Sequence, residues 1–283
     1  MEKNKVLPST LYLVGTPIGN LADISQRAKK VLSEVDFIAA EDTRNSMKLL
    51  NCYGIRKELI SYYEHNKKMM GERIVARLLG GESCALITDA GMPAISDPGE
   101  DIVALCGENG VRVSVIPGCC AAVSALSLSG LPTGKFTFEG FLPAVKGDRR
   151  KALEDLSEEK RTMIFYEAPH KLRQTLSDMA EIFGTDRRIS LCRELTKLNE
   201  EVIRTTVGEA VEYYSEREPR GEYVLVLSGN DKKTLADPSL LTLTPDGHVS
   251  YYEGQGLTRK DAIKAAAKDR GMSKSDFYKL LVD

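Results

Sequence analysis

Short apolar runs alternate with helix-like patterns along the first 133 residues, and this alternation limits the folds open to the chain. The spacing predicts strands at Leu11 to Val14, Phe37 to Ala40, Ala85 to Ile87 and Val113 to Ile116, and helices near 25–33, 73–79 and 100–108. Strand–helix–strand repeats of this length are typical of a mainly parallel sheet covered by helices, with right-handed crossovers. We therefore expect an α/β domain at residues 1–133.

The pattern changes after the Gly- and Pro-containing segment 129–134. Strands are then expected at 136–142, 163–166, 189–192, 202–207 and 223–227, with helices near 150–156, 171–183 and 208–214. Some of these strands follow one another after a short connection, as between Leu191 and Val202, which indicates a mixed sheet. The sequence thus predicts a second α/β domain at residues 134–234.

Residues 235–283 are expected to form a linker, which contains Pro238 and Pro245, followed by a small helical module. Thr258 and Ser273 are suited to cap two short helices that Gly271 separates. Two short helices joined at a glycine are typical of a helix-turn-helix unit.

One face of the first of these helices is predicted to carry Lys260, Lys264 and Lys268, which recur at every fourth residue. Such a face is either simply solvated or binds phosphates. The net charge of the whole chain is only −2, so no general basic field attracts nucleic acid. A nucleic-acid partner therefore has to be held by local patches of this kind.

The cysteine and histidine content gives no sign of a disulfide framework or a metal centre. The six cysteines form no CxxC pair and the three histidines are scattered, so a metal site is not expected. This cysteine usage is typical of a reducing cytosol, and we expect a cytoplasmic protein. No apolar run approaches the roughly 20 residues that span a bilayer.

The segment 88–99 (TDAGMPAISDPG) follows a predicted strand and then abandons regular structure. Its two glycines allow positive φ and close approach to a ligand, while its two prolines stiffen the turns. The segment is either a preformed binding loop or only a sharp turn. Loops of similar composition follow two other strands, at 15–20 and 117–122. Because ligands of α/β proteins lie beyond the carboxyl ends of the strands, three such loops favour a ligand site.

Charged residues follow other predicted strands. Glu41, Asp42 and Arg44 come after the strand that ends at Ala40, where they either act on a substrate or form a helix cap with an ion pair. The segments 166–170 and 193–197 either face the first domain across a cleft or form structural ion pairs. The segment 146–151 carries four cations and is either a solvated loop or a phosphate-binding one.

These motifs together resemble the tetrapyrrole methylase superfamily. The match covers roughly residues 8–230, and its most specific parts are segments 41–44, 88–99, 165–170 and 193–197. The form of the long loop, with Gly91-Met92-Pro93, is similar to that of the branch that acts on bacterial small-subunit ribosomal RNA. The resemblance implies two α/β domains with S-adenosylmethionine (SAM) in the cleft between them, and a homodimer.

The resemblance also implies the function and its residues. The expected reaction is SAM-dependent 2′-O-methylation of a cytidine ribose in 16S ribosomal RNA, with no metal. Cofactor contacts are implied for Pro17, Asp89, Ala90, Gly91, Met92, Ile95, Cys120, Ala121, Glu167 and Thr206. Glu41 and Asp42 are the expected bases, with Arg44 orienting the substrate or binding phosphate. Basic residues expected to bind RNA are Arg149, Arg150, Lys151, Lys260, Lys264 and Lys268.

Two other functions stay open at this point. One is a methyltransferase for a porphyrin-like or other small molecule, and the other is an RNA-binding assembly factor that only retains a SAM pocket.

Overall fold

The computed structural model describes residues 5–230 and 238–281. The chain divides into two compact units, one that ends at Gly229 and one that begins at Asn230. In these described ranges no helix is both long and apolar enough to cross a membrane.

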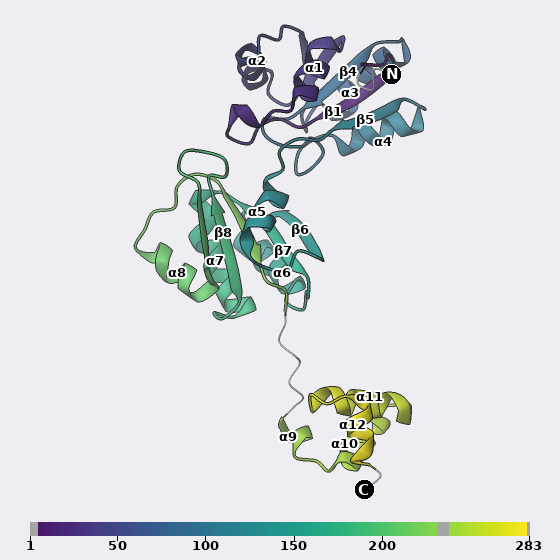
Figure 1. Ribbon diagram of the computed structural model, residues 1–283, viewed down its shortest axis with the longest axis vertical. Coiled ribbons are helices and arrows are strands. Elements are labelled where there is room, and N and C mark those ends of the chain that lie inside the picture. The colour runs from purple at the N-terminus through teal and green to yellow at the C-terminus, as the bar shows by residue number, and fades with distance from the viewer. Residues whose placement is uncertain (1–4, 231–237, 282–283) are drawn as a thin grey trace. The chain divides into compact units, whose positions relative to one another are not determined.

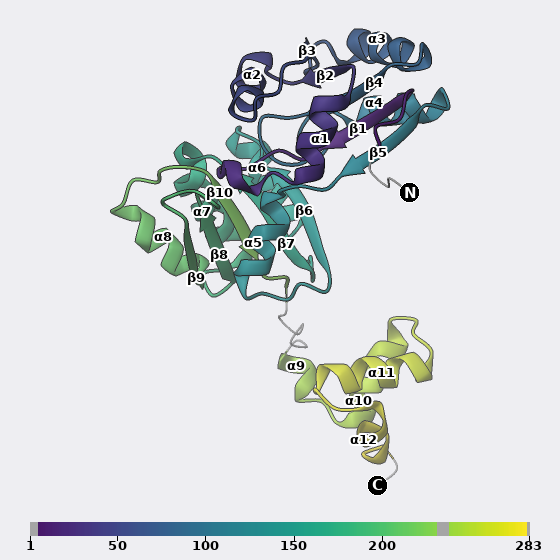
Figure 2. The ribbon, with the colours of Figure 1, turned by 45° about the horizontal axis from the view of Figure 1, so that its top comes forward.

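The first unit begins with a five-stranded parallel sheet in the order β3-β2-β4-β1-β5 (Figure 1). Its strands are β1 Thr10–Val14, β2 Phe37–Ala40, β3 Glu58–Ser61, β4 Ser83–Ile87 and β5 Arg112–Ile116. Helices α1 Gln26–Glu34 and α2 Thr43–Cys52 cover one face, and α3 Lys67–Leu79 and α4 Glu100–Glu108 cover the other (Figure 2). Burial on both faces explains why the central strands β1, β2 and β4 are mostly apolar rather than alternating.

The sheet contains one strand and one helix that the sequence pattern did not predict. β3 reads Glu-Leu-Ile-Ser and lies at the edge of the sheet, so it carries no continuous apolar run. α2 follows directly from β2 with a mostly polar sequence and only two buried residues. Both elements bury too little apolar surface to stand out in the sequence.

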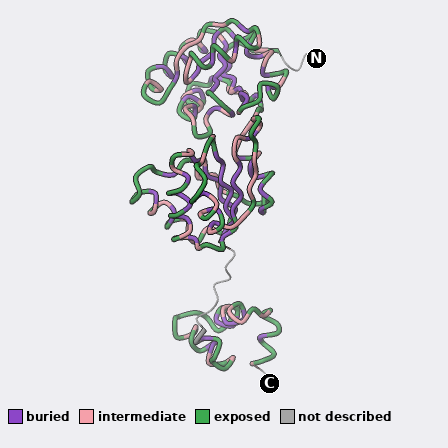
Figure 3. The backbone as a smooth tube through the Cα atoms, turned by 90° about the vertical axis from the view of Figure 1, so that its left-hand side faces the viewer, coloured by how far each residue is buried: buried purple, intermediate pink, exposed green. Residues whose placement is uncertain are grey.

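The second sheet has the order β6-β7-β10-β8-β9 and is mixed, as predicted. Within this sheet only the pairing of β6 Phe136–Phe141 with β7 Thr162–Glu167 is parallel. β10 Tyr223–Leu227 is antiparallel to both of its neighbours, and β8 and β9 are antiparallel to each other. β8 spans Arg188–Arg193 and β9 spans Glu201–Thr206. The central strands β7, β10 and β8 are buried over most of their length (Figure 3).

Helices cover both faces of this second sheet. Helices α6 Lys146–Asp155, α7 Pro169–Phe183 and α8 Val207–Ser215 pack on one face. Helix α5 Ala121–Ser129 follows β5 of the first sheet, yet it packs on the other face of the second sheet through Ala125 and Leu126. The chain therefore passes from one sheet to the other at the start of α5. The domain boundary at 133/134 stays a prediction, and the one at 234/235 lies outside the described residues.

The segment 146–151, expected as a loop, is instead the first part of α6. The loop prediction is wrong because four cations within six residues hide the helix pattern, in which only Arg149 and Leu153 are buried.

The second unit is helical, with α9 Pro238–Leu241, α10 Pro245–Gly254, α11 Arg259–Asp269 and α12 Lys274–Lys279. Helices α11 and α12 begin after Thr258 and Ser273, whose side chains accept backbone hydrogen bonds as predicted. The linker prediction fails at 245–254, since these residues form α10. Thr244 caps this helix, and proline is well tolerated at a first helical position.

The three longer helices of this unit share a small core of Val249, Ala262, Ile263, Ala266, Ala267 and Phe277. His248 of α10 is fully buried, with Nε2 3.1 Å from the Asp269 carboxylate and Nδ1 3.2 Å from Nε of Arg270. This polar network ties α10 to the end of α11.

Candidate functional site

Three loops meet at the carboxyl edge of the first sheet. The backbones of Thr16 and Gly91 exchange two hydrogen bonds, with N···O distances of 2.9 and 3.2 Å. A Cβ atom on Gly15 would lie 2.7 Å from Cα of Gly118 and equally close to the Met92 sulfur. Only a glycine at position 15 permits this approach. The loops at 15–20, 88–99 and 117–122 therefore support one another through their main chains.

The long loop holds its shape with backbone conformations that side-chain-bearing residues rarely adopt. Ala94 and Ser96 have φ values of 66° and 61°, and the loop also contains Gly91 at 89°. Non-glycine residues in this region are strained, and such strain persists where the surroundings impose it. This rigid, irregular backbone is the wall of a pocket.

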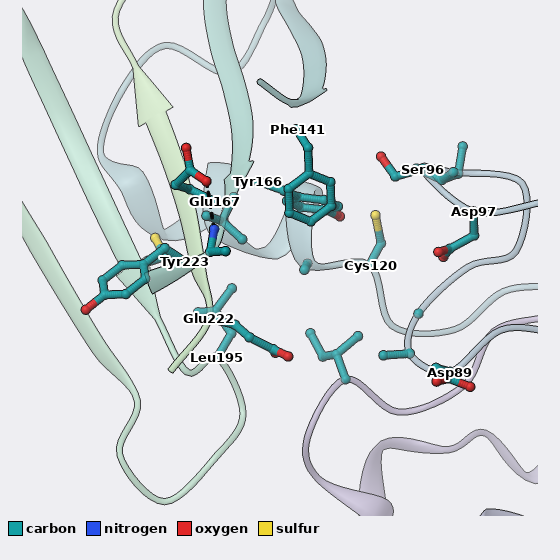
Figure 4. A pocket seen from close by; sticks show the side chains of 18 of the residues that line it. Asp89, Ser96, Asp97, Cys120, Phe141, Tyr166, Glu167, Leu195, Glu222 and Tyr223 are labelled. Carbon is teal, nitrogen blue, oxygen red and sulfur yellow. Dashed lines mark hydrogen bonds between the residues drawn. The ribbon is translucent and has the colours of Figure 1, made fainter. Parts of the chain in front are cut away.

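The pocket is about 560 Å³ in volume, within the usual range for small-molecule sites. Loops that follow strands of the first sheet line one part of it, and strands of the second sheet with their connecting loops line the other (Figure 4). Its lining residues are Ile18, Asp89, Ala90, Gly91, Met92, Ile95, Ser96, Asp97, Cys120, Ala121, Phe141, Tyr166, Glu167, Ala168, Pro169, His170, Cys192, Leu195, Glu222, Tyr223 and Val224. The walls are mainly apolar, with a few carboxylates among them.

Most of the residues expected to contact the cofactor line this pocket. They are Asp89, Ala90, Gly91, Met92, Ile95, Cys120, Ala121 and Glu167. Pro17 is buried beside the pocket, between Thr16 and the lining residue Ile18, and does not line it.

Thr206 is not brought to the pocket. β9 runs antiparallel to β8, so Thr206 pairs with Arg188 at one end of β8, whereas Cys192 near the other end lines the pocket. The Thr206 side chain instead caps α8 in a reciprocal arrangement with Glu209. Thr206 thus lies outside the pocket lining and has a structural role as a helix cap.

Glu167 is a buried carboxylate at the pocket wall, exposed by only 3%. One carboxylate oxygen accepts a hydrogen bond from the Ala168 amide at 2.8 Å, and the other accepts one from the Thr175 hydroxyl at 2.5 Å. These bonds fix the side chain just before α7, where the exposed amides of a helix N-terminus favour negative charge. Glu167 is thereby rigid rather than free to move with a ligand.

Carboxylates also gather at the edge of the first sheet. Burial raises the pKa of Glu41, and the nearby charges of Asp97 and Asp89 raise it further. Burial also raises the pKa of Asp97, again with a contribution from Asp89. A carboxyl group that is more basic than usual is better suited to accept a proton near neutral pH.

Asp42 and Arg44 form the N-terminal cap of α2. Asp42 caps α2, with its carboxylate accepting the Arg44 amide at 2.8 Å, and this bond lowers the pKa of Asp42. The Arg44 side chain is mostly exposed and lies 3.5 Å from the same carboxylate. The helix-cap interpretation therefore fits these two residues, and neither they nor Glu41 line the pocket.

The cations at 149–151 differ strongly in exposure. The Arg149 side chain is 2% exposed, and its Nε donates to the Asp178 carboxylate at 2.8 Å. It is therefore not placed to bind RNA, because α6 turns it toward α7. Arg150 pairs with Asp178 and Glu181, whereas Lys151 is exposed. Lys260, Lys264 and Lys268 are all exposed on α11.

The segment 193–197 combines structural ion pairs with one pocket residue. Nζ of Lys197 lies 2.9 Å from the carboxylates of both Glu194 and Glu222. Leu195 lines the pocket, as does Glu222. The sequence pattern had not indicated Phe141, Glu222 or Tyr223, because each joins the pocket only through the pairing of distant strands.

The comparisons with known proteins agree with this geometry. The family model described as Tetrapyrrole (Corrin/Porphyrin) Methylases matches residues 10–211. The chain is 50% identical over 274 residues to "Ribosomal RNA small subunit methyltransferase I" of Halalkalibacterium halodurans, which covers 96% of this chain and 94% of that protein. Proteins of the same name from Bacillus subtilis and Escherichia coli O157:H7 are 47% and 43% identical, covering 95% and 96% of this chain and 92% and 94% of their own.

Solved structures share the fold at low identity. Diphthine synthase superposes with a TM-score of 0.60 at 14% identity, covering 78% of this chain and 90% of that one. Cobalt precorrin-4 methyltransferase does so with a TM-score of 0.57 at 17% identity, covering 78% and 95%. With the fold, the loops and the family model in agreement, the chain belongs to the tetrapyrrole methylase family.

Proposed function

We propose that this protein is a SAM-dependent methyltransferase that 2′-O-methylates the ribose of a cytidine in 16S ribosomal RNA of the small subunit. The observation that carries the proposal is the similarity over 95–96% of the chain to the three relatives cited above, which are named for methylation of small-subunit ribosomal RNA. A reaction of this kind needs a methyl donor, a pocket for it and a route for the substrate.

The pocket fits S-adenosylmethionine, the cofactor of this family. The close approach of the loops at Gly15 and Gly118 fixes the loops that supply one wall of the pocket, including Ala90, Gly91 and Met92. Apolar atoms of Ala121, Leu195 and Val224 suit the flat and aliphatic parts of such a molecule, and the carboxylates suit its cationic groups. When bound, the cofactor supplies a methyl group carried on a positively charged sulfur.

The chain's own residues have two tasks in the transfer. The interlocked loops position the two reactants, and positioning can supply roughly 7–11 kcal/mol of the barrier. A base would accept the proton that the ribose 2′-hydroxyl loses as its oxygen bonds to the methyl carbon and the bond from that carbon to the donor sulfur breaks, leaving a neutral thioether. Such a base typically contributes about 10²- to 10⁴-fold. Glu41 is the better candidate for this base, since its pKa is raised while that of Asp42 is lowered.

RNA is proposed to be held outside the pocket by exposed cations. Lys151 on α6 and the lysine face of α11, made of Lys260, Lys264 and Lys268, are available to phosphates. Arg150, which is already paired, contributes less, and Arg149 is excluded by burial. We also propose that the protein acts as a homodimer. Its six free cysteines are in keeping with a location in the reducing cytoplasm.

The test is incubation of the protein with isotopically labelled SAM and small ribosomal subunits from a strain that lacks the protein. Label should appear in 16S RNA on the ribose of one cytidine, which alkaline-resistance mapping locates. Label in a porphyrin-like acceptor instead would indicate a small-molecule methyltransferase. SAM binding without any transfer would indicate an assembly factor.

A further inference from the structure

Phe141 is a large aromatic side chain that lines the pocket and is nevertheless 58% exposed. Figure 4 shows it beside Tyr166, on the side of the pocket where Ser96 and Asp97 lie. An exposed aromatic face inside a binding cavity leaves apolar area available for a ligand. The question is which ligand it suits.

A β-bulge aims Phe141 at this cavity. In the pairing of β6 with β7, Phe138 lies opposite Ile164 and Phe141 lies opposite Tyr166, because the register shifts between Phe138 and Gly140. Residues three apart in a regular strand point to opposite faces, so one extra residue puts Phe138 and Phe141 on the same face. Gly140, with φ of 65°, supplies the backbone conformation at the bulge.

The ring of Phe141 packs against Tyr166, while more than half of the residue stays exposed. Its centroid lies 5.4 Å from that of Tyr166, edge to face, and Phe138 packs on Tyr166 at 5.0 Å. The Tyr166 hydroxyl accepts a hydrogen bond from the Ala122 amide at 3.2 Å. Phe141 is therefore preorganised by its neighbours while much of it stays exposed.

The long loop contributes a carboxylate to the cavity that this ring lines. A Cβ atom on Gly140 would lie 3.3 Å from the Ser96 hydroxyl, so the tip of the long loop rests against the bulge. Asp97 follows Ser96, is half-buried and lines the same pocket. Burial raises the pKa of Tyr166, and the charges of Cys120 and Asp97 raise it further. Aromatic ring and carboxylate thus share one end of the cavity.

The charge of the lining excludes phosphate as the ligand of this end. The lining residues carry four carboxylates, on Asp89, Asp97, Glu167 and Glu222, and no lysine or arginine. Phosphates should therefore stay outside, whereas a planar group with amino donors suits a ring beside a carboxylate.

We propose that Phe141 and Asp97 form a nucleobase subsite, in which the base of the target nucleotide stacks on Phe141 and its exocyclic amino group donates a hydrogen bond to the Asp97 carboxylate. The inference rests on the proposed function and says which residues select the base of the target nucleotide. Cytosine carries such an amino group where uracil carries a carbonyl oxygen, so Asp97 favours cytidine. Stacking on Phe141 replaces the stacking that the base loses when it leaves the RNA.

The first experiment compares Phe141→Leu with Phe141→Tyr and with the control Phe136→Leu, an exposed phenylalanine on β6 outside the pocket. We measure methylation of small subunits under kcat/KM conditions and SAM binding by calorimetry. Loss of base stacking should lower kcat/KM roughly 5- to 150-fold in Phe141→Leu while SAM affinity stays within about twofold. Phe141→Tyr should restore most of the activity, and Phe136→Leu should match the original protein.

The second experiment uses Asp97→Asn on subunits that carry either the mapped cytidine or a uridine in its place. The amide donates to the uracil carbonyl, so the preference for cytidine over uridine should fall at least about tenfold. A variant that lost activity equally on both substrates would show that Asp97 does not read the base.

The outcomes separate this inference from the proposed function. If the original protein methylates no RNA, the proposed function fails. If it methylates RNA but Phe141→Leu is equally active, or if Phe141→Leu weakens SAM binding as much as it lowers turnover, the nucleobase subsite is wrong.

Discussion

Glu41 and Asp42 are neighbouring carboxylates whose environments move their pKa values in opposite directions. Burial and the charges of Asp97 and Asp89 raise the pKa of Glu41, while the hydrogen bond from the Arg44 amide lowers that of Asp42. Two acids with divergent pKa values are a common sign of divided roles. Here one is suited to accept a proton and the other to cap a helix.

Replacing Glu41 by glutamine should therefore lower kcat by about 10²- to 10⁴-fold, because the amide cannot accept the ribose proton. Asp42→Asn is the matched control, since asparagine caps helices nearly as well as aspartate. It should retain kcat within a few fold. Single-turnover methylation at saturating SAM measures both; equal rates for Glu41→Gln and the original protein would exclude Glu41 as the base.

The raised pKa of Glu41 has a consequence for stability. A carboxyl group with a raised pKa in the folded state binds its proton more tightly there, so ionising it destabilises the fold as pH rises. Glu41→Gln should consequently melt at a higher temperature than the original protein at pH 7.5. The difference should shrink below about pH 4, near the pKa of an ordinary carboxyl group, where both states are protonated. Melting curves at both pH values would reveal the opposite trend if the carboxylate were stabilising.

Replacing Arg149 should lower the free energy of unfolding far more than replacing Lys151. Arg149→Met leaves the buried Asp178 carboxylate with one fewer partner and should destabilise the protein by about 3–5 kcal/mol. Lys151→Gln, on an exposed side chain, should change stability by less than about 0.5 kcal/mol. Urea unfolding measures both values. A near-neutral Arg149→Met would mean that the ion pair is dispensable.

At the scale of elements, the main feature is the meeting of three loops at Gly15 and Gly118. Gly15→Ala would place a Cβ atom 2.7 Å from a backbone atom, which cannot move aside as a side-chain tip can. We expect SAM affinity to fall at least about tenfold, since the loops must separate. Gly107→Ala is the control, with no atom within 4 Å and a helical position, and it should be neutral or stabilising by about 0.5–1 kcal/mol.

Much of this arrangement could be predicted from the sequence. The central strands β1, β2 and β4 are buried on both faces and are therefore mostly apolar, and the loops rich in glycine and proline after β1, β4 and β5 are recognisable. The long loop, Cys120 and Ala121 accordingly line the pocket, and their contact with the cofactor stays a prediction.

The rest depended on which strands pair and how. Phe141 reaches the pocket through a one-residue shift between β6 and β7, and Thr206 is kept from it by the antiparallel direction of β9. Arg149 is buried by the rotation of α6 against α7. None of these follows from local periodicity, because each is decided by a partner element far along the chain.

At the scale of the whole molecule, the lysine face of α11 belongs to a separate compact unit with its own core. Replacing Lys260, Lys264 and Lys268 together by glutamine should weaken RNA binding and reduce the slope of log affinity against log salt by roughly 2–3. SAM binding should not change. Filter binding at several salt concentrations measures the slope.

A triple glutamine variant at Lys48, Lys68 and Lys160, which are exposed residues of the first unit, controls for the loss of net charge. It should reduce the slope less than the α11 variant does. Equal reductions would mean that RNA responds to net charge rather than to the lysine face of α11.

The loops around Gly15 are joined through main-chain atoms, and this has an evolutionary consequence. Amide-to-carbonyl bonds such as those between Thr16 and Gly91 are indifferent to most side-chain exchanges. Substitutions at the rim of the cavity can then change which acceptor molecule binds, while the part of the pocket that binds the methyl donor keeps its shape. A constant backbone framework with a variable rim suits a fold that this chain shares with proteins only 14–20% identical to it in sequence.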